Sequence, residues 1–144
     1  MKKVLLIFSG VILLAFAGGG KLKDGQFDGT SRSVYIDEPL YGSTRITIEN
    51  GKITSVAFAI RDSSKHEFFN SEYEKYMEGN KLYIQQCRND WKGVNSYPDS
   101  LLKYQDIDKV DAISGATWSY NIFKASVKKA LKHADETSEN QQTR

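Results

Sequence analysis

The sequence predicts an α+β fold: a small, mostly antiparallel sheet with helices packed on one side. Two observations predict it, namely a hairpin signal in the first half of the chain and an amphipathic helix near its end. The chain has 144 residues, of which 40% are hydrophobic and 26% are charged. This composition is ordinary for a globular protein and provides one modest core. The order of the strands does not follow from the sequence.

The hairpin signal surrounds Asn50-Gly51. Apolar and polar side chains alternate over residues 44–49, and residues 52–60 resume the alternation with one polar pair inside the run. Asn-Gly between two such runs is a strong short-range hairpin signal, because both turn positions need a positive φ. Residues 26–36 also contain stretches that favour a strand. The first half of the chain therefore predicts the sheet.

A C-terminal amphipathic helix is predicted over residues 119–134. Its apolar side chains recur at the spacing of one helix face, and most of its lysines lie off that face. Residues 135–144 contain no large apolar residue, so we expect a disordered tail there. The apolar face of the helix consists of Ile122, Phe123, Val127, Ala130, Leu131 and Ala134.

The middle of the chain carries weaker signals. Residues 71–86 favour a helix that Ser71 would cap. Gly79-Asn80 interrupts this pattern, which leaves one helix or two. We expect residues 89–96 to be irregular and the apolar residues 110–113 to form a brief strand.

The first 17 residues have the anatomy of a secretory signal peptide. A pair of lysines precedes an apolar run of about 14 residues, and Ala15-Phe16-Ala17 fits the small-x-small rule of signal peptidase. The run is shorter than the ~20 residues that span a bilayer, so cleavage is favoured over an uncleaved anchor. We expect a linker over residues 18–23, one folded domain over residues 24–134, and export to the periplasm or to the outer face of the cytoplasmic membrane.

Charge and side-chain chemistry argue against several classes of protein. The formal net charge is +2, and without the two leader lysines 18 basic residues face 18 acidic ones. A nucleic-acid binder should carry a basic stripe, which is not visible, so nucleic acid is not an expected partner. Cys87 is the only cysteine, and a small hydrophobe is favoured there over a reactive thiol. His66 and His133 lack the spacing of metal ligands, which argues against a zinc site.

One segment points to chemistry, Asp111-Ala112-Ile113-Ser114-Gly115-Ala116-Thr117. It places four small residues directly before the predicted C-terminal helix. Small residues permit close approach of a ligand, and a helix start supplies unpaired N–H groups and the positive end of a dipole. A hydroxyl at Thr117 would lie where an anion binds, so the segment can form a phosphate cradle. The alternative, from the residues alone, is that Thr117 or Ser119 only caps the helix.

The same segment resembles the flavinylation motif of the FMN-binding domain family. That family includes flavin subunits of sodium-pumping NADH:quinone oxidoreductase and many exported bacterial flavoproteins. The resemblance spans roughly residues 24–134: DGQFDGTSRS and ITIENGKITSVAF are similar to the family's opening strand and hairpin, and NSEYEKYM is similar to a middle helix. The motif is specific in this context, whereas the hairpin alone would be weak.

The resemblance implies a covalent flavoprotein. A separate magnesium-dependent flavin transferase would take FAD as donor, move FMN onto the hydroxyl of Thr117 and release AMP. Thr117 would then be a covalent acceptor and not a catalytic nucleophile. The other motif residues (Asp111, Ser114, Gly115 and Ala116) would shape the turn or be recognised by the transferase. The candidate aromatics for covering the flavin ring are Tyr41, Trp91, Tyr97 and Trp118.

The function that this resemblance implies is extracytoplasmic electron transfer. FMN would take electrons from a membrane donor and pass them to an acceptor outside the cytoplasm. The chain shows no substrate-pocket motif of its own, so an electron carrier is favoured over a stand-alone enzyme. Two alternatives stay open: an FMN-dependent reductase module that acts on a small substrate, and a surface binding protein that kept the fold without the flavin.

Overall fold

The structure is a computed structural model that describes residues 22–33, 35 and 37–135. The expected signal peptide, all but the last two residues of the expected linker, and the expected tail beyond Asp135 lie outside the described residues. Within the described part of the chain, no helix combines the length and the apolar character needed to cross a membrane.

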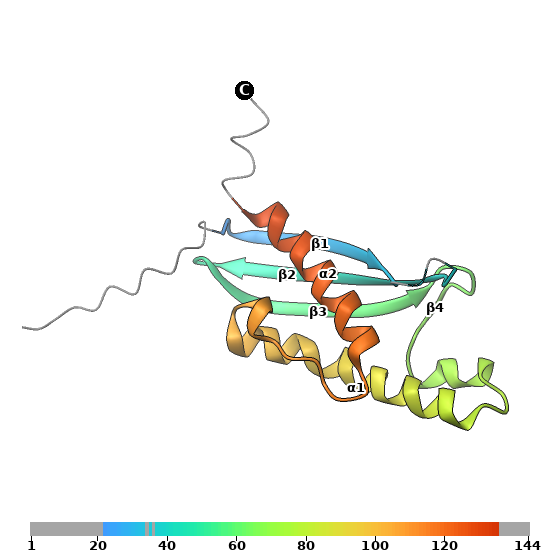
Figure 1. Cartoon of the computed structure of the whole chain (residues 1–144). Helices are drawn as coiled ribbons and strands as arrows, with labels where there is room; N and C mark the ends of the chain where they lie inside the picture. The colour runs from blue at the N-terminus through green and yellow to red at the C-terminus, as the bar shows by residue number, and fades with distance from the viewer. Residues whose placement is uncertain (1–21, 34, 36, 136–144) are drawn as a thin grey trace, which may run out of the picture.

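The sheet is a four-stranded antiparallel meander in the order β1-β2-β3-β4 (Figure 1). The predicted hairpin is confirmed, because β2 and β3 pair directly and Asn50 and Gly51 have φ angles of 52° and 71°. Positive φ at both positions matches the twist of the flanking strands. The strands are β1 (Gly25–Arg32), β2 (Leu40–Glu49), β3 (Lys52–Asp62) and β4 (Glu67–Phe68).

Helices cover one face of this sheet, which confirms the predicted α+β class. The C-terminal helix is also confirmed, and it begins two residues earlier than predicted. Helix α2 packs on β1 and β2, and helix α1 packs on β3 (Figure 1). The helical segments are the 3₁₀ turns η1 (Ser71–Tyr76) and η2 (Ile107–Lys109) and the helices α1 (Lys81–Tyr104) and α2 (Thr117–Ala134).

Helix α1 corrects the expectation for the middle of the chain. Residues 89–96, expected to be irregular, lie inside it, and the predicted helix over residues 71–86 is divided between η1 and the first turns of α1. A Cβ at Gly93 would lie 2.7 Å from the ring of Tyr97 and 2.9 Å from Oγ of Ser119. This glycine therefore allows α1 to approach the start of α2, and tertiary packing overrides its weak helix propensity.

Two local expectations were also wrong. Asn70 rather than Ser71 caps η1, because the Asn70 side chain accepts a hydrogen bond from the N–H of Glu72. Residues 110–113 form no strand. The carbonyl of Val110 instead accepts a 2.6 Å hydrogen bond from the hydroxyl of Tyr120 on α2.

The core fills the space between the sheet and the two helices. Phe123 of α2 is fully buried, and its ring lies 4.9 Å from that of Phe58 and 5.6 Å from that of Tyr97, centroid to centroid. Ile46 of β2 and Leu101 of α1 complete this layer with no exposed surface. The face of α2 predicted to be apolar is therefore the one that packs on the sheet.

Small residues bring α2 very close to β1. A Cβ at Gly29 would lie only 2.0 Å from the carbonyl oxygen of Ser126. The hydroxyl of Ser31 donates a 3.0 Å hydrogen bond to the carbonyl of Ile122, and the hydroxyl oxygens of Thr44 and Ser126 lie 2.5 Å apart. These contacts fix how far α2 can slide along the sheet, and so they fix the position of its first turn.

The two ends of the described chain lie side by side. The backbone N–H of Lys23 donates a 2.8 Å hydrogen bond to the carbonyl of Ala134, and Leu22 forms a β-bridge with Asp135. Strand β1 therefore begins next to the C-terminal end of α2 (Figure 1).

Asp62, at the end of β3, is a buried carboxylate that organises the following turn. Its Oδ1 accepts hydrogen bonds from the N–H and the hydroxyl of Ser64 at 2.7 and 2.6 Å, and its Oδ2 accepts one from the hydroxyl of Tyr73. Burial alone would raise the pKa of Asp62, but these hydrogen bonds outweigh it and lower the pKa from 3.8 to about 2. The folded state therefore favours the ionised carboxylate.

The low pKa of Asp62 predicts a loss of stability in acid. Because the folded pKa lies below the unfolded one, this contribution is present above about pH 4 and is lost as the pH falls toward 2. The free energy of unfolding should decrease between about pH 4 and pH 2. We expect this decrease to be smaller in Asp62→Asn than in the wild type, by on the order of 1–2 kcal/mol. Urea titrations at a series of pH values from 2 to 6 measure the free energy of unfolding. The same dependence of this free energy on pH in the wild type and in Asp62→Asn would contradict the prediction.

Candidate functional site

The motif segment forms the turn that leads into α2. The N–H of Ala116 donates a 2.9 Å hydrogen bond to the carbonyl of Ile113. Gly115 has a φ of 77°, a conformation that residues with a side chain rarely adopt. Asp111 and Ser114 are exposed, and within the described part of the chain neither side chain makes a hydrogen bond or an ion pair.

Thr117 is the first residue of α2, and it is exposed. The N-cap position is occupied by Ala116, which has no side-chain oxygen, so the alternative that Thr117 or Ser119 is the N-cap is wrong. Over the described ranges, nothing accepts a hydrogen bond from the backbone N–H of Thr117 or Trp118. A hydroxyl and two N–H groups are thus available at the positive end of the helix dipole.

The third N–H of α2 is bound by a residue of α1. Asp90 is only 2% exposed, and its Oδ1 accepts hydrogen bonds from the N–H of Ser119 at 3.1 Å and from its hydroxyl at 2.8 Å. Nε2 of Gln86 donates to Oδ2 of Asp90 at 3.0 Å and to the carbonyl of Gly115 at 2.6 Å. Helix α1 therefore holds both the turn and the first turn of α2.

Tyr97, one of the predicted ring contacts, lies beneath the motif. It is fully buried, its hydroxyl donates to the carbonyl of Ala116 at 2.9 Å, and it accepts from the N–H of Ile113 at 3.1 Å. Burial raises the pKa of Tyr97, so the hydroxyl stays protonated and remains a donor. In this position Tyr97 supports the turn from the core side.

The other predicted aromatic residues lie in different surroundings. Trp91 is 8% exposed and packs against Phe69, with no hydrogen-bond partner for its indole Nε1 in the described part of the chain. Tyr41 follows the buried Leu40 on β2, and so its side chain points to the opposite face of the sheet. Trp118 alone among the four lines a cavity next to Thr117.

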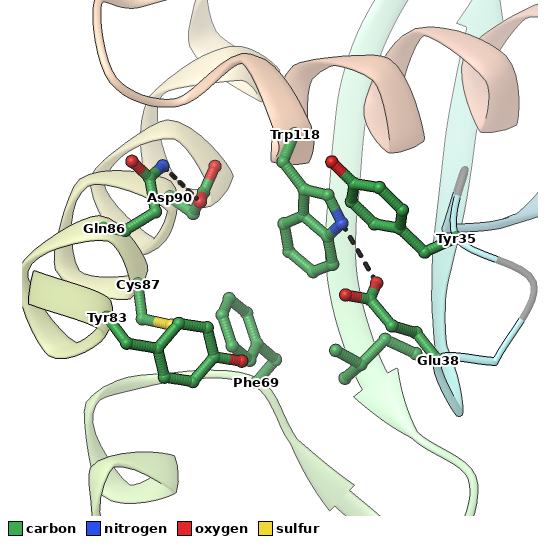
Figure 2. Close-up of a pocket in the computed structure, with 9 residues that line it drawn as sticks. Tyr35, Glu38, Phe69, Tyr83, Gln86, Cys87, Asp90 and Trp118 are labelled. Atoms are coloured by element: carbon green, nitrogen blue, oxygen red, sulfur yellow. Dashed lines mark hydrogen bonds between the residues drawn. The ribbon is translucent and has the colours of Figure 1, made fainter. Parts of the chain in front are cut away.

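This cavity of about 260 Å³ opens between the start of α2 and the first turns of α1 (Figure 2). Trp118 forms one wall, and Tyr83 and Cys87 of α1 lie across from it (Figure 2). The ring of Phe69 lies 5.2 Å from that of Trp118, edge to face. The indole Nε1 of Trp118 donates to Oε2 of Glu38 at 3.2 Å, which fixes the orientation of the wall.

The lining of the cavity is aromatic and acidic. Glu38 and Asp90 contribute carboxylates, and none of the described lining residues is a lysine or an arginine. Burial raises the pKa of Cys87 to about 11, so this residue contributes a neutral thiol. Such a lining suits a flat, uncharged ring and disfavours a phosphate, whereas the neighbouring helix start favours a phosphate. The two surfaces together suit a ligand with a ring at one end and a phosphate at the other.

Comparison with known proteins agrees with this chemistry. The sequence profile of the FMN-binding domain family matches residues 40–132, from the start of β2 to near the end of α2. The chain belongs to the FMN-binding domain family. Both the motif and most of the cavity residues lie within the matched range, and the domain binds FMN as its cofactor.

Two solved structures resemble this FMN-binding domain, and no curated protein matches it. The crystal structure of a protein from Clostridium perfringens is 25% identical, with a TM-score of 0.60 over 85% of this chain and 93% of the other. The solution NMR structure of a protein from Clostridium thermocellum is 19% identical, with a TM-score of 0.48 over 80% of this chain and 94% of the other. The first of these shows the same fold.

The residues around the start of α2 fit FMN. The N–H groups of Thr117 and Trp118, for which the described part of the chain supplies no acceptor, suit its phosphate. The cavity of about 260 Å³ lies slightly below the ~300 Å³ at which pockets for small ligands begin, and its aromatic lining suits one part of the cofactor, the flat ring. Trp118 links the two surfaces, because it belongs to the helix start and also lines the cavity.

Sequence reasoning missed Gln86 and Asp90. Together with Gly93 and Tyr97 they recur at intervals of four, three and four residues, which is the spacing of one helix face. That signal could be used only if residues 89–96 were taken as helical. Because these residues were expected to be irregular, the four positions were not recognised as one helix face that contacts the motif.

Proposed function

We propose that this FMN-binding domain is an extracytoplasmic electron-transfer protein whose FMN is joined to Thr117 through a phosphoester. One observation carries the proposal: the exposed Thr117 is the first residue of α2, next to backbone N–H groups that have no acceptor among the described residues and next to an aromatic cavity. Helix starts of this kind bind phosphate groups. The proposed location and a membrane electron donor rest on the first 17 residues, which have the pattern of a signal peptide.

Attachment is a group transfer carried out by a separate flavin transferase with FAD and magnesium. The hydroxyl oxygen of Thr117 forms a bond to the phosphorus of the FMN half, the pyrophosphate bond of FAD breaks, the hydroxyl proton is lost and AMP leaves. Among the described residues, no histidine or carboxylate forms a hydrogen bond with the hydroxyl of Thr117, which agrees with a chain that is the substrate of the transferase.

The side chains of the site then hold the cofactor in place. The N–H groups of Thr117 and Trp118 would donate to the phosphate, while Trp118, Phe69 and Tyr83 would offer aromatic surface to the ring. Bound FMN supplies one- and two-electron redox chemistry, and the protein contributes orientation and electrostatics. A covalent bond prevents loss of the cofactor by dilution outside the cytoplasm.

Thr117→Ala should abolish attachment of FMN. The test is the intact mass of the protein after co-expression with a flavin transferase. The wild-type chain should gain the mass of one FMN less one water, and Thr117→Ala should gain nothing. Thr54→Ala is a matched control, because it removes another exposed threonine hydroxyl, on β3 and far from the motif in sequence.

An unmodified wild-type chain would contradict covalent attachment, and a modified Thr117→Ala chain would place the bond on another residue. Once the wild type is modified, electron transfer is tested with the loaded protein. Reduction by a low-potential donor followed by oxidation by a soluble acceptor supports a carrier. Steady turnover of a small substrate by the loaded protein alone would favour a reductase instead.

Trp118→Leu tests the cavity as the site of the flavin ring. An indole close to a flavin quenches its emission, so we expect the variant to keep the attached FMN and to fluoresce several-fold more strongly. Tyr104→Leu is the control, since it removes an exposed aromatic ring at the far end of α1. Equal emission from the wild type and Trp118→Leu would place the ring elsewhere.

A further inference from the structure

We infer that one face of α1 is a positioning device for the attachment site, with Asp90 as its central positioning residue. The inference rests on the proposed function and adds how Thr117 is presented to the transferase. Asp90 accepts a hydrogen bond from the N–H of Ser119 at the start of α2, on the core side of the helix. Gln86 and Tyr97 donate hydrogen bonds to carbonyl groups of the preceding turn. None of the three bonds to Thr117 itself.

The first three N–H groups of α2 differ in their hydrogen bonds. An N-cap side chain normally accepts a hydrogen bond from the second or third N–H of its helix, and so it occupies the space where an anion would bind. Ala116 at the N-cap position makes no such bond, and Asp90 takes over the third N–H, that of Ser119, from the core side. Within residues 22–33, 35 and 37–135, no group accepts a hydrogen bond from the first two N–H groups, those of Thr117 and Trp118.

Side chains of α1 also hold the turn that precedes α2. Nε2 of Gln86 bonds both to Oδ2 of Asp90 and to the carbonyl of Gly115, so the cap and the turn belong to one network. The hydroxyl of Tyr97 bridges the carbonyl of Ala116 and the N–H of Ile113. Backbone groups on both sides of Thr117 are therefore fixed by side chains of α1.

The network that holds the turn is rigid. Asp90 and Tyr97 are 2% and 0% exposed, and a satisfied polar network of this kind, shielded from water, is stiff. Gly93 lies between them on α1, and it lets α1 approach Ala116 and Ser119 closely. The turn is thus held in one shape before any partner arrives, which lowers the cost of aligning the Thr117 hydroxyl for transfer.

The experiment measures the rate of attachment. The full chain, purified without flavin, is incubated with a flavin transferase, FAD and magnesium well below its unfolding temperature, and intact mass is followed over time. Asp90→Ala should slow attachment about tenfold or more, because a misplaced reacting group costs up to about 100-fold. Asp90→Asn should recover part of the rate, since its amide oxygen can still accept the N–H of Ser119, whereas its NH₂ group cannot accept the hydrogen bond that Gln86 donates to Oδ2.

Gln105→Ala is the matched control. Gln105 also bonds a backbone N–H and a carbonyl, those of Ile53, but it does so at the far end of α1. Its loss should lower stability and leave the rate of attachment unchanged. Amide hydrogen exchange gives a second readout, in which the N–H of Ser119 should exchange faster in Asp90→Ala and at the wild-type rate in Gln105→Ala.

Two results would overturn the positioning role and leave covalent attachment standing. One is wild-type attachment by Asp90→Ala, and the other is slowing of Asp90→Ala and Gln105→Ala in proportion to their loss of stability. A wild-type chain that gains no mass, although the transferase modifies a known substrate, would overturn both this inference and the proposed function.

Discussion

Phe123→Ala is expected to lower the free energy of unfolding by roughly 3–5 kcal/mol, the usual cost of truncating a buried aromatic ring. Phe123 is fully buried, and its ring packs on those of Phe58 and Tyr97. Truncation leaves a cavity at the junction of the sheet, α1 and α2, which none of these elements can fill alone. Urea unfolding followed by far-UV circular dichroism measures the loss.

Tyr104→Ala is the control for this prediction. Tyr104 is 44% exposed at the end of α1, so its removal creates no cavity and should cost within about 0.5 kcal/mol. A Phe123→Ala protein as stable as this control would show that the ring is not part of the core. Because Tyr97 supports the motif turn, Phe123→Ala should also speed hydrogen exchange at the N–H of Ile113.

Gly29→Ala is expected to destabilise the protein by about 3 kcal/mol or more, at the upper end of the range for overpacked sites. The added methyl group would meet the backbone oxygen of Ser126 at 2.0 Å and the backbone nitrogen of Ala130 at 2.6 Å. A change of rotamer cannot relieve a clash with backbone atoms, so α2 has to move away from β1. The free energy of unfolding from chemical denaturation should fall, and the rate of flavin attachment should change because α2 has moved.

Gly79→Ala separates this packing effect from a general effect of replacing glycine. Gly79 has a φ of 84°, and a Cβ added there would meet no atom within 4 Å, so only backbone strain of about 1–2 kcal/mol is expected. Attachment of the flavin should be unaffected. Equal losses of stability in the two variants would contradict the close approach of α2 to β1.

The hairpin and the last helix could be predicted because their signals are local. Asn50-Gly51 requires only the two strands beside it, and its positive φ angles follow from the residue types. Apolar residues recur at helix spacing along the whole of α2, so the pattern is recognisable even where one position departs from it. Gly29 carries no such signal, since the need for a glycine appears only when Ser126 is placed against it.

The long central helix could not be predicted for the opposite reason. Gly93 and Pro98 are poor helix residues, and local preference favours a break there. The helix persists because Tyr97, Leu101 and their neighbours bury their side chains in the core. A charged residue such as Asp90 is normally expected at the surface, and only the fold shows it meeting the N–H of Ser119.

Part of the candidate site was predicted from the sequence and part was not. Thr117 and the small residues before it were singled out by chemistry and by resemblance, and they do form the turn at the start of a helix. The cavity beside them is built from α1, α2, Phe69 and the residues around Glu38, which are far apart in sequence. No pattern in the sequence predicts that these segments lie next to one another.

The contact between Leu22 and Asp135 would determine which way a flavin faces if it is attached to Thr117 as proposed. Helix α2 has 18 residues, so at 1.5 Å per residue its two ends lie about 27 Å apart. The chain enters the domain at one end of this helix, and Thr117 lies at the other. Any support that holds residues before Leu22 would therefore be joined to the end of the domain opposite Thr117, and a flavin attached to Thr117 as proposed would face away from that support. A partner that exchanges electrons with the flavin would then approach from the outward side, and the length of α2 would act as a spacer between the support and the redox centre.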